Sequence, residues 1–517
     1  MKRTILYIIL SLPFLGCESM LDISPRNSVT FENAFLNEKE LETGILSMEY
    51  AFRNNIGNFQ YENVRTRGCF SDFHVYWDQA ILQNEARVYL SQWNIVYNII
   101  AAANVPLPYI DKLDMPQIRK DFYKGCVLFT KALCYFELIR KWGDCVVVYD
   151  EVAMDPIPKQ SWVKVADYAI GMAEEAVRLL PEFPDVKDSN GNKVIYKSRP
   201  SKGAANALLA HLCAWKAGCK YFAQPQEAGY DDRTLWEKAE KACTALIESE
   251  IYALAATPEE VCTKTLLGGD KESIYETVFK DFWHEVGLPT MAFCFGADYE
   301  TYPIIPGKGK GDIKKAQYRI KNETVRGLFP TRIEGGKSVT DLRRDAYFHD
   351  FENMEKEAPE ITGGYAYPRK WRYVRVGTSG WQTGRFINFD QNRIWWRLAD
   401  IILLRAECRT RLGNSAGAIE DLNTVRRRAH AAPYRSSEYG GDLRYAVFKE
   451  REKELLMEGH RYYDVVRNGY SATELYGGFR NLSLQDMIDG AFFDGIGSEE
   501  FRNNPLARQN TFWLKRL

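Results

Sequence analysis

One stretch of the 517-residue sequence has the spacing of a serine nucleophile, the G-x-S-x-G run Gly413-Asn414-Ser415-Ala416-Gly417. In hydrolases this motif follows a strand, and a strained turn exposes the serine. Here apolar residues at helical spacing stand on both sides, which predicts helices over 393–412 and 415–430. We expect Gly413 to end the first helix and Ser415 to begin the second. The motif favours a turn between helices over a catalytic serine.

Other catalytic or cofactor motifs are missing from the sequence. The six histidines form no H-E-x-x-H motif, and the cysteines form no C-x-x-C pair or zinc-ligand spacing. The stretch GKGKGD at 307–312 lacks the spacing and the strand-to-helix context of a phosphate-binding loop. Two carboxylates could still meet in space as in glycosidases, although no pair stands out among the 69 acidic residues. The sequence therefore predicts no enzyme, no metal and no cofactor.

The densest charged motif is FKEREKELLMEGHRYYDVVRNG, near the C-terminus. Its apolar residues repeat at helical spacing, so we expect one helix over 442–467. Glu450, Glu454 and Glu458 stand four residues apart, and arginines flank them. Ion pairs within one helix contribute only about 0.2–0.5 kcal/mol each, too little to explain so many charges beside apolar residues. We expect pairing with a second helix, such as the one that contains RLADIILLRAE.

The N-terminus has the pattern of an export signal that ends at a cysteine. Lys2 and Arg3 precede the apolar run Ile5–Leu15, which is shorter than the roughly 20 residues that span a membrane. A basic start, a short apolar core and a small residue before the cleavage site are typical of a secretory signal. Gly16-Cys17 predicts a bacterial lipoprotein signal, in which the Cys17 thiol is lipidated and becomes the new N-terminus. We expect Cys17 to tether the protein to a membrane.

The composition indicates a globular protein with more than one subregion. The chain has 68 basic and 69 acidic residues and is 45% hydrophobic. Near-neutral charge argues against nucleic acid as a partner, because phosphate binding needs a basic surface. Several of the ten cysteines after Cys17 lie within apolar helical patterns such as VLFTKALCYF, so we expect buried thiols and no specified disulfides. About 500 mature residues exceed what one simple core holds.

Helical periodicity dominates the N-terminal part and returns near the C-terminus. Besides the segments above, we expect helices over 38–54, 120–141, 162–180, 200–222 and 234–249. Within 200–218, small residues at three- or four-residue spacing would let another helix approach closely; they are Gly203, Ala207, Ala210, Ala214 and Ala217. These features predict a mainly α fold, a scaffold of tetratricopeptide-like helical hairpins, although no strict 34-residue repeat occurs.

The middle of the chain, from about 255 to 390, is different. It is rich in Gly, Pro and Tyr, and short β-like runs such as YVRV alternate with turn residues. We expect a loop-rich irregular insert with short β-strands, and loops on a rigid scaffold commonly carry binding residues. The predicted organisation is a signal peptide at 1–16, a helical scaffold at 17–254, a loop-rich ligand-binding region at 255–390, and C-terminal helices with a tail at 391–517.

The charged motif, E-R-x-x-E-L-x-x-E-G-x-R-x-x-D-x-x-R over 450–467, resembles the C-terminal signature of the SusD/RagB family. Further resemblances follow in the family's order: C-x-x-x-L-D-x-x-P at 17–25, K-A-x-C-Y-F-E-L and W-G-D within 131–144, S-K-G-A-A at 201–205, D-x-R-R-D at 341–345, R-x-A-D-x-x-L-L-x-A-E at 397–407 and N-x-x-R-x-R-A at 423–429. One departure is Val146, where the family's G-D-V-P has proline. On this order of motifs the chain is identified as a member.

The resemblance implies a lipoprotein of the outer membrane, exposed at the cell surface, that binds nutrients without chemistry. Members of the family cover a SusC-like TonB-dependent outer-membrane barrel, capture mostly oligosaccharides and release them into this transporter. In them the helical half packs on the barrel and the irregular half contacts the ligand. The main hypothesis is therefore a non-catalytic glycan-binding lipoprotein. Three alternatives stay open: capture of peptides by the same kind of complex, a periplasm-facing helical-repeat adaptor that binds only protein, and, remotely, an enzyme.

Sugar capture favours flat aromatic faces beside side chains that hydrogen-bond to hydroxyls. One set of such residues lies in CFSDFHVYWDQ, before an expected helix around Trp93, and comprises Asp72, Phe73, Tyr76, Trp77 and Asp78. A second set lies in the loop-rich region and comprises Trp283, Tyr299, Tyr302 and Trp381. Each aromatic could instead pack in the core or within a loop, and the sequence alone does not separate the two roles.

Overall fold

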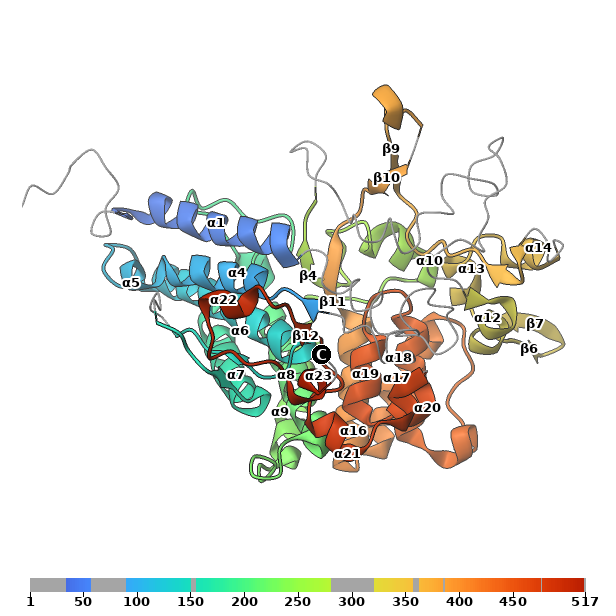
Figure 1. Ribbon diagram of the computed structural model, residues 1–517. Helices are drawn as coiled ribbons and strands as arrows, with labels where there is room; N and C mark the ends of the chain where they lie inside the picture. Colours follow the sequence, from blue (N-terminus) through green and yellow to red (C-terminus); the bar gives the residue numbers. More distant parts are fainter. Residues whose placement is uncertain are drawn as a thin grey trace, which may run out of the picture.

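The computed structural model describes residues 34–56, 90–149, 155–279, 320–356, 362–384, 386–475 and 477–515. Within these ranges the fold is mainly helical, as predicted, and its strands pair in short two-stranded sheets (Figure 1). One hydrophobic core extends from the first helix to the C-terminal segment. None of the helices in these ranges is long and apolar enough to cross a membrane. The predicted signal at 1–16 and Cys17 lie outside them.

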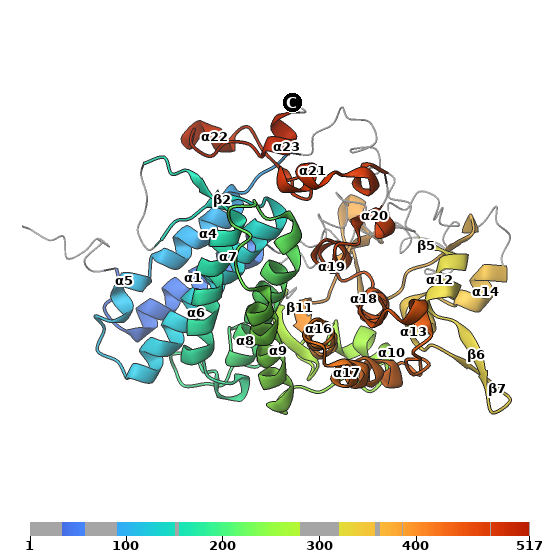
Figure 2. The ribbon, with the colours of Figure 1, turned by 90° about the horizontal axis from the view of Figure 1, so that it is seen from below.

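The N-terminal half is a row of helices that pack side by side (Figures 1 and 2). They are α1 (Glu38–Ile56), α4 (Asn94–Asn104), α5 (Leu107–Ile110), α6 (Gln117–Lys141), α7 (Trp162–Leu179), α8 (Lys202–Gly218) and α9 (Asp232–Glu248). Two of them begin at serine caps, since the Ser161 and Ser201 hydroxyls accept hydrogen bonds from backbone N–H groups three residues later. α6 packs on α7, α7 on α8, and α8 on α9, which confirms the predicted scaffold of helical hairpins.

The predicted row of small residues lies on α8, and all five are buried. The packing is tightest at Gly203, where a Cβ atom would lie 2.3 Å from the Tyr252 hydroxyl oxygen. Protein interiors are close-packed, so this position has no room for a side chain. The close approach of neighbouring elements to this helix is confirmed.

We expect Gly203→Ala to lower the free energy of unfolding by about 1–3 kcal/mol, because the new methyl group overpacks the core at Tyr252. The matched control is Gly171→Ala in α7, where the glycine is exposed and a Cβ atom would meet nothing within 4 Å. Alanine there should leave stability unchanged or raise it by up to about 1 kcal/mol. Urea unfolding of both variants checks this, and equal stabilities would contradict the packing at Gly203.

The C-terminal half begins with a strand where a helix was predicted. β11 (Arg393–Arg397) pairs antiparallel with β4 (Ser273–Thr277), and both strands are buried. The helix predicted over 393–412 is therefore wrong in its first five residues, and α16 covers Leu398–Leu412. The aromatic residues of RIWWR suit a buried strand, but their partner lies far away in the sequence, where helical periodicity carries no information.

The helix predicted over 442–467 is also wrong as a single element. α18 (Leu443–Glu454) ends early, and α19 (Arg461–Asn468) follows after a turn. Met457 and Gly459 in this turn have φ of +65° and +82°, a left-handed backbone that ends a helix. The remaining elements of the C-terminal half are α17 (Ser415–Arg428), α20 (Ser471–Glu474), α21 (Leu484–Ile488), β12 (Gly495–Ile496), α22 (Glu500–Asn503) and α23 (Thr511–Leu514).

The middle region is irregular in its described part, as predicted. Its helices are short, namely α10 (Pro258–Glu260), α12 (Asn322–Leu328), α13 (Arg343–Tyr347) and α14 (Phe351–Lys356). Its strand pairs are β5 (Ile320–Lys321) with β8 (Tyr365–Ala366), β6 (Thr331–Glu334) with β7 (Lys337–Thr340), and β9 (Val374–Val376) with β10 (Phe386–Phe389). The YVRV run contributes β9. The boundaries of the four predicted regions stay predictions.

The G-x-S-x-G motif forms the predicted turn between helices. Gly413, with φ +84°, ends α16, and the Asn414 side chain caps α17 by accepting a hydrogen bond from the Gly417 N–H at 3.0 Å. The element directly before Ser415 is the helix α16 and not a strand, so the geometry of a hydrolase nucleophile is missing here. The eight cysteines within the described ranges are all buried with free thiols, as predicted; Cys69 and Cys294 lie outside those ranges.

The glutamates of the charged motif meet a set of buried cations. Arg397 lies at the centre, with 2.7 Å from its Nη1 to Glu454 Oε1 and 2.8 Å from its Nη2 to Glu458 Oε1. We call the connected buried set the signature network; its members are Glu272, Asp341, Arg343, Lys370, Arg397, Arg426, Arg428, Glu450, Glu454 and Glu458. Beside it, Arg451 binds Asp400 of α16 at 2.8 Å. Pairing across helices is therefore confirmed.

Candidate functional site

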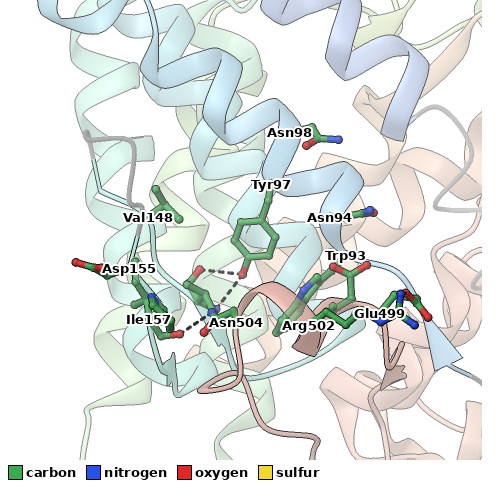
Figure 3. A pocket seen from close by; sticks show the side chains of 13 residues that line it. Trp93, Asn94, Tyr97, Asn98, Val148, Asp155, Ile157, Glu499, Arg502 and Asn504 are labelled. Carbon is green, nitrogen blue, oxygen red and sulfur yellow. Dashed lines mark hydrogen bonds and ion pairs between the residues drawn. The ribbon is translucent and has the colours of Figure 1, made fainter.

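The candidate site is a pocket of about 720 Å³ between the N-terminal helices and the C-terminal segment (Figure 3). One wall is α4, the second comprises Val146, Val148 and residues 155–157, and the third is α22 with its flanking residues. The volume lies within the range of roughly 300–1,000 Å³ that is typical of pockets for small organic ligands. What such a pocket can bind depends on its aromatic and polar side chains.

Trp93 and Tyr97, one turn apart at the start of α4, form the aromatic part of the pocket. Their ring centroids lie 5.5 Å apart, edge to face, and the buried Trp93 holds the Tyr97 ring in place. The Tyr97 hydroxyl donates to the Val146 carbonyl and accepts from the Val146 N–H, each at 2.9 Å. Burial raises the pKa of Tyr97 well above its ordinary value, so the hydroxyl is neutral. A ligand can therefore contact the face of this fixed ring but not its hydroxyl.

Polar side chains flank this aromatic wall on both sides. Asn94 and Asn98 stand one turn apart on the exposed side of α4 (Figure 3). Across the pocket, Arg502 pairs with Glu499 at 2.7 Å and remains largely exposed, and Asp155 lies in the second wall. Amides both donate and accept hydrogen bonds, carboxylates accept, and a guanidinium donates. This set can satisfy several hydroxyl groups on one neutral polar ligand.

Two side chains hold the C-terminal wall against the rest of the pocket. The Asn504 amide donates to the Ile157 carbonyl at 2.8 Å. Glu500 lies at the N-terminus of α4, where the residue at the cap position, Trp93, makes no side-chain capping bond. Burial raises the pKa of Glu500, and the backbone N–H groups of Asn94 and Trp93 oppose this shift. These contacts explain why α22 stays beside α4.

The third wall comes from the far end of the chain. β12 pairs parallel with β1 (Leu90–Ser91), and the Ser91 hydroxyl donates to Asp494 at 3.0 Å. The Asn510 amide donates to the Trp142 carbonyl at 2.9 Å. Figure 2 shows the C-terminal segment with α21, α22 and α23 lying across the ends of the N-terminal helices. The pocket therefore lies where the C-terminal segment meets the N-terminal helices.

A second pocket, of about 670 Å³, lies between the β6–β7 hairpin and α17. Its exposed arginines already have partners, since Arg332 pairs with Glu334 at 2.7 Å and Arg427 with Glu420 at 3.0 Å. No Phe, Tyr or Trp stands among the described residues that line it. The pocket at α4 has both aromatic and uncommitted amide groups, so it is the better candidate for a ligand site.

One residue of the predicted ligand-binding sets lies in the described part of the chain. Trp381 stands in the turn between β9 and β10 and does not line the α4 pocket. The other predicted residues lie outside the described ranges; they are Asp72, Phe73, Tyr76, Trp77, Asp78, Trp283, Tyr299 and Tyr302. Their roles, like the lipidation of Cys17, stay predictions.

The sequence interpretation missed the polar residues of the α4 pocket. A signal was present in W-N-x-x-Y-N at 93–98, which places an aromatic ring and two amides on one helix. Arg502 and Asn504 had no such signal, because nothing in the sequence pairs the C-terminal segment with α4. No Ser, Cys or His stands among the described lining residues, and the described chain contains no cluster of His, Cys, Asp or Glu arranged to hold a metal ion.

Two family models match the chain, one in each half. The model described as the SusD family matches residues 326–505, and the model described as starch-binding associating with outer membrane matches residues 20–213. The first includes most of the signature network, and the second includes α4. The chain belongs to the SusD/RagB family. SusD/RagB proteins are non-catalytic binding proteins associated with the outer membrane, and this chain is one of them.

Relatives of this SusD/RagB protein match nearly its whole length. SusD-like protein P25 of Formosa agariphila is 22% identical over 504 residues, which is 90% of each chain. The structure of a SusD homolog from Bacteroides thetaiotaomicron has a TM-score of 0.71 at 23% identity and covers 92% of this chain and 98% of that one. Surface glycan-binding protein A from Bacteroides uniformis has a TM-score of 0.67 at 18% identity and covers 92% and 100%. The SusD fold therefore extends over almost the entire chain.

Proposed function

We propose that this SusD/RagB protein captures oligosaccharides at the cell surface and delivers them, without chemistry, to a SusC-like TonB-dependent transporter. The observation that carries the proposal is the α4 pocket, in which a fixed aromatic ring stands between the amides of Asn94 and Asn98 and the exposed ion pair of Arg502 with Glu499. Membership in a family of non-catalytic binding proteins supports it. The family description "starch-binding" and the name of the Bacteroides uniformis relative, surface glycan-binding protein A, both point to glycans as the ligand class.

The chemistry of the pocket suits a sugar in two ways. The apolar C–H face of a pyranose ring can pack on the exposed part of the Tyr97 ring, which does not move because Trp93 and Val146 hold it. Hydroxyl groups around the sugar can then reach Asn98 and Arg502 on opposite sides of the pocket. A peptide would need unpaired backbone groups in an extended segment of the site, whereas the backbone of Val146 and the carbonyl of Ile157 in the second wall already bond to Tyr97 and Asn504.

We infer the anchor and the partner from the resemblance to the family. Lipid on Cys17 would hold the protein at the outer membrane, and stable anchoring takes more than one acyl chain. The helical half then lies next to the transporter, as in the family. In this arrangement the protein raises the local concentration of a glycan at the transporter without changing it chemically.

We expect Asn98→Ala and Arg502→Ala each to weaken glycan binding about 3- to 10-fold, because each substitution removes a hydrogen-bonding group from the pocket. The test is affinity electrophoresis of the soluble chain against soluble starch, laminarin and xylan. The matched control is Asn481→Ala, an exposed asparagine away from the pocket, which should bind like the wild-type protein. If all three variants retain full affinity for a glycan that the wild type binds, the α4 pocket is not the binding site.

A further inference from the structure

Acidic side chains outnumber basic ones in the α4 pocket. Three carboxyl groups line it, those of Asp155, Glu499 and Glu500. Arg502 carries the only cation among its described lining residues, which include no lysine or histidine. A like charge in a binding site repels a charged ligand, and specificity commonly depends on such a repulsive group. The balance of charges in this pocket therefore favours a neutral ligand over an anionic one.

The guanidinium of Arg502 is already paired within the pocket wall. Its Nη1 lies 2.7 Å from Glu499 Oε2, and Glu499 stands at the cap position of α22, the helix that contains Arg502 (Figure 3). A carboxylate on a ligand would have to displace Glu499 or share the guanidinium with it. A sugar hydroxyl needs no such exchange, because a guanidinium has several N–H donors and a hydroxyl can accept from one that Glu499 leaves free. Glu499 thus weakens the contact with an acidic sugar more than the contact with a neutral one.

The N-terminus of α4 is the second place in the pocket that suits an anion. Backbone N–H groups without a partner in the helix and the helix dipole both favour negative charge there. Trp93, at the cap position, makes no side-chain capping bond. The backbone N–H groups of Trp93 and Asn94 bond to Glu500 instead. The carboxyl group of Glu500 therefore occupies the position that an acidic group of a ligand would take.

We propose that the α4 pocket rejects acidic glycans, because Glu499 and Glu500 occupy the two groups in its described walls that would bind a carboxylate. The inference rests on the proposed function and narrows its ligand class to neutral glycans. Glu499 is the specificity-determining residue that can be tested alone, because it is exposed and its pair with Arg502 is confined to one short helix. Without Glu499, the guanidinium is free to form charge-assisted hydrogen bonds with a carboxylate on a ligand. A neutral glycan keeps its contacts with Tyr97 and Asn98 in either case.

The test uses two ethers of the polysaccharide that the wild type binds best among starch, laminarin and xylan, substituted to the same degree. The carboxymethyl ether carries negative charge, and the hydroxyethyl ether is neutral and of similar size. In calorimetric titrations we expect the wild type to bind the hydroxyethyl ether about 5- to 20-fold more tightly. Glu499→Gln should raise the affinity for the carboxymethyl ether about 3- to 10-fold and change the affinity for the hydroxyethyl ether by less than about twofold. The double variant Glu499→Gln/Arg502→Ala should show no gain for the carboxymethyl ether.

The matched control is Glu237→Gln, which removes the same charge from an exposed ion pair on α9. Glu237 pairs with Arg233 at 3.0 Å and its side chain is 52% exposed, compared with 54% for Glu499. This variant should keep the wild-type preference between the two ethers, because Glu237 does not line the pocket. Exposed ion pairs contribute little to stability, so all of these variants should keep the wild-type thermal midpoint.

The outcomes separate this inference from the proposed function. If the wild type binds the hydroxyethyl ether no more tightly than the carboxymethyl ether, the rejection of acidic glycans is refuted while glycan capture stands. The role of Glu499 is refuted if Glu499→Gln brings no gain for the carboxymethyl ether, if Glu237→Gln brings the same gain, or if the gain persists without Arg502. If the wild type binds none of the three unmodified polysaccharides, the proposed function is refuted and this inference with it.

Discussion

Replacing Arg397 with alanine is expected to lower the free energy of unfolding by about 3–5 kcal/mol, a large fraction of the stability of a typical folded protein. Arg397 pairs with Glu272, Glu454 and Glu458, and all four side chains are almost completely buried. Without the guanidinium, each of these three carboxylates stays buried and loses one of its cation partners. Removal of one partner from a buried ion pair is strongly destabilising, because the remaining charge loses both its partner and water.

The matched control for Arg397→Ala is Arg427→Ala, which removes the same side chain from an exposed ion pair. Arg427 and Glu420 pair at 3.0 Å, and both side chains are about two-thirds exposed or more. Exposed pairs contribute roughly 0–1 kcal/mol, so this variant should unfold at nearly the wild-type urea concentration. Urea unfolding followed by tryptophan fluorescence compares the two. A small decrease in the free energy of unfolding at both positions would show that the signature network does not hold the two helices of the charged motif, α18 and α19, in place.

Acid should unfold the protein because the glutamates of the signature network hold their charge in the core. Burial raises the pKa of Glu450 and Glu458, but Arg343 and Arg397 respectively, with further cations, outweigh burial and lower each to about 2. Unfolded glutamates titrate near pH 4.3. As the pH falls below this value, the unfolded chain takes up protons first. The stabilisation that these two glutamates provide is therefore complete above about pH 4.5. As the pH falls to 2, the free energy of unfolding decreases by up to about 3 kcal/mol for each of them.

A separate loss of stability should begin at higher pH, because two histidines are buried. Burial lowers the pKa of His460 to about 4, and burial also lowers the pKa of His211. Unfolded histidine titrates near pH 6.5, so the unfolded state binds a proton first between pH 6.5 and 4, and stability falls over that interval. His460→Asn should reduce the loss between pH 6.5 and 4 and leave the loss below 4.5 intact. Urea unfolding at pH steps from 7.5 to 2.5 resolves both, and constant stability down to pH 3 would contradict this assignment of charges.

The helical half of the fold was predictable because its information is local. In α7 and α8 the apolar spacing, the capping serines at Ser161 and Ser201 and the small residues of α8 all lie within the helices they specify or next to them. The two errors arose where tertiary structure overrides local pattern. Arg393–Arg397 forms a strand because β4 pairs with it, and the turn at Met457 breaks a sequence that has good helical periodicity.

The charged motif shows how much of a buried site a sequence can specify. The density of charge around Glu454 predicted pairing between helices, and the structure confirms it for α16. The sequence did not reveal that Glu272 and Lys370 join the same network, since they lie in other segments. Pairing partners from distant segments become visible only when the chain is folded.

The α4 pocket was predictable only in part. The helix around Trp93 was expected, and W-N-x-x-Y-N places its aromatic and amide groups together. The opposite wall depends on the pairing of β1 with β12, two short strands about 400 residues apart in the sequence, and so Arg502 could not be assigned to the site. Long-range pairing of this kind has no local signal in the sequence.

The most direct test of glycan capture is calorimetric titration of the soluble chain, residues 18–517, with soluble starch, laminarin and xylan, followed by an assay for reducing ends in each mixture. We expect saturable heats with at least one polysaccharide and no release of reducing ends, because the α4 pocket offers contacts for sugars and the family binds without chemistry. Absence of binding to every polysaccharide, or release of reducing ends from any of them, would contradict the proposed function.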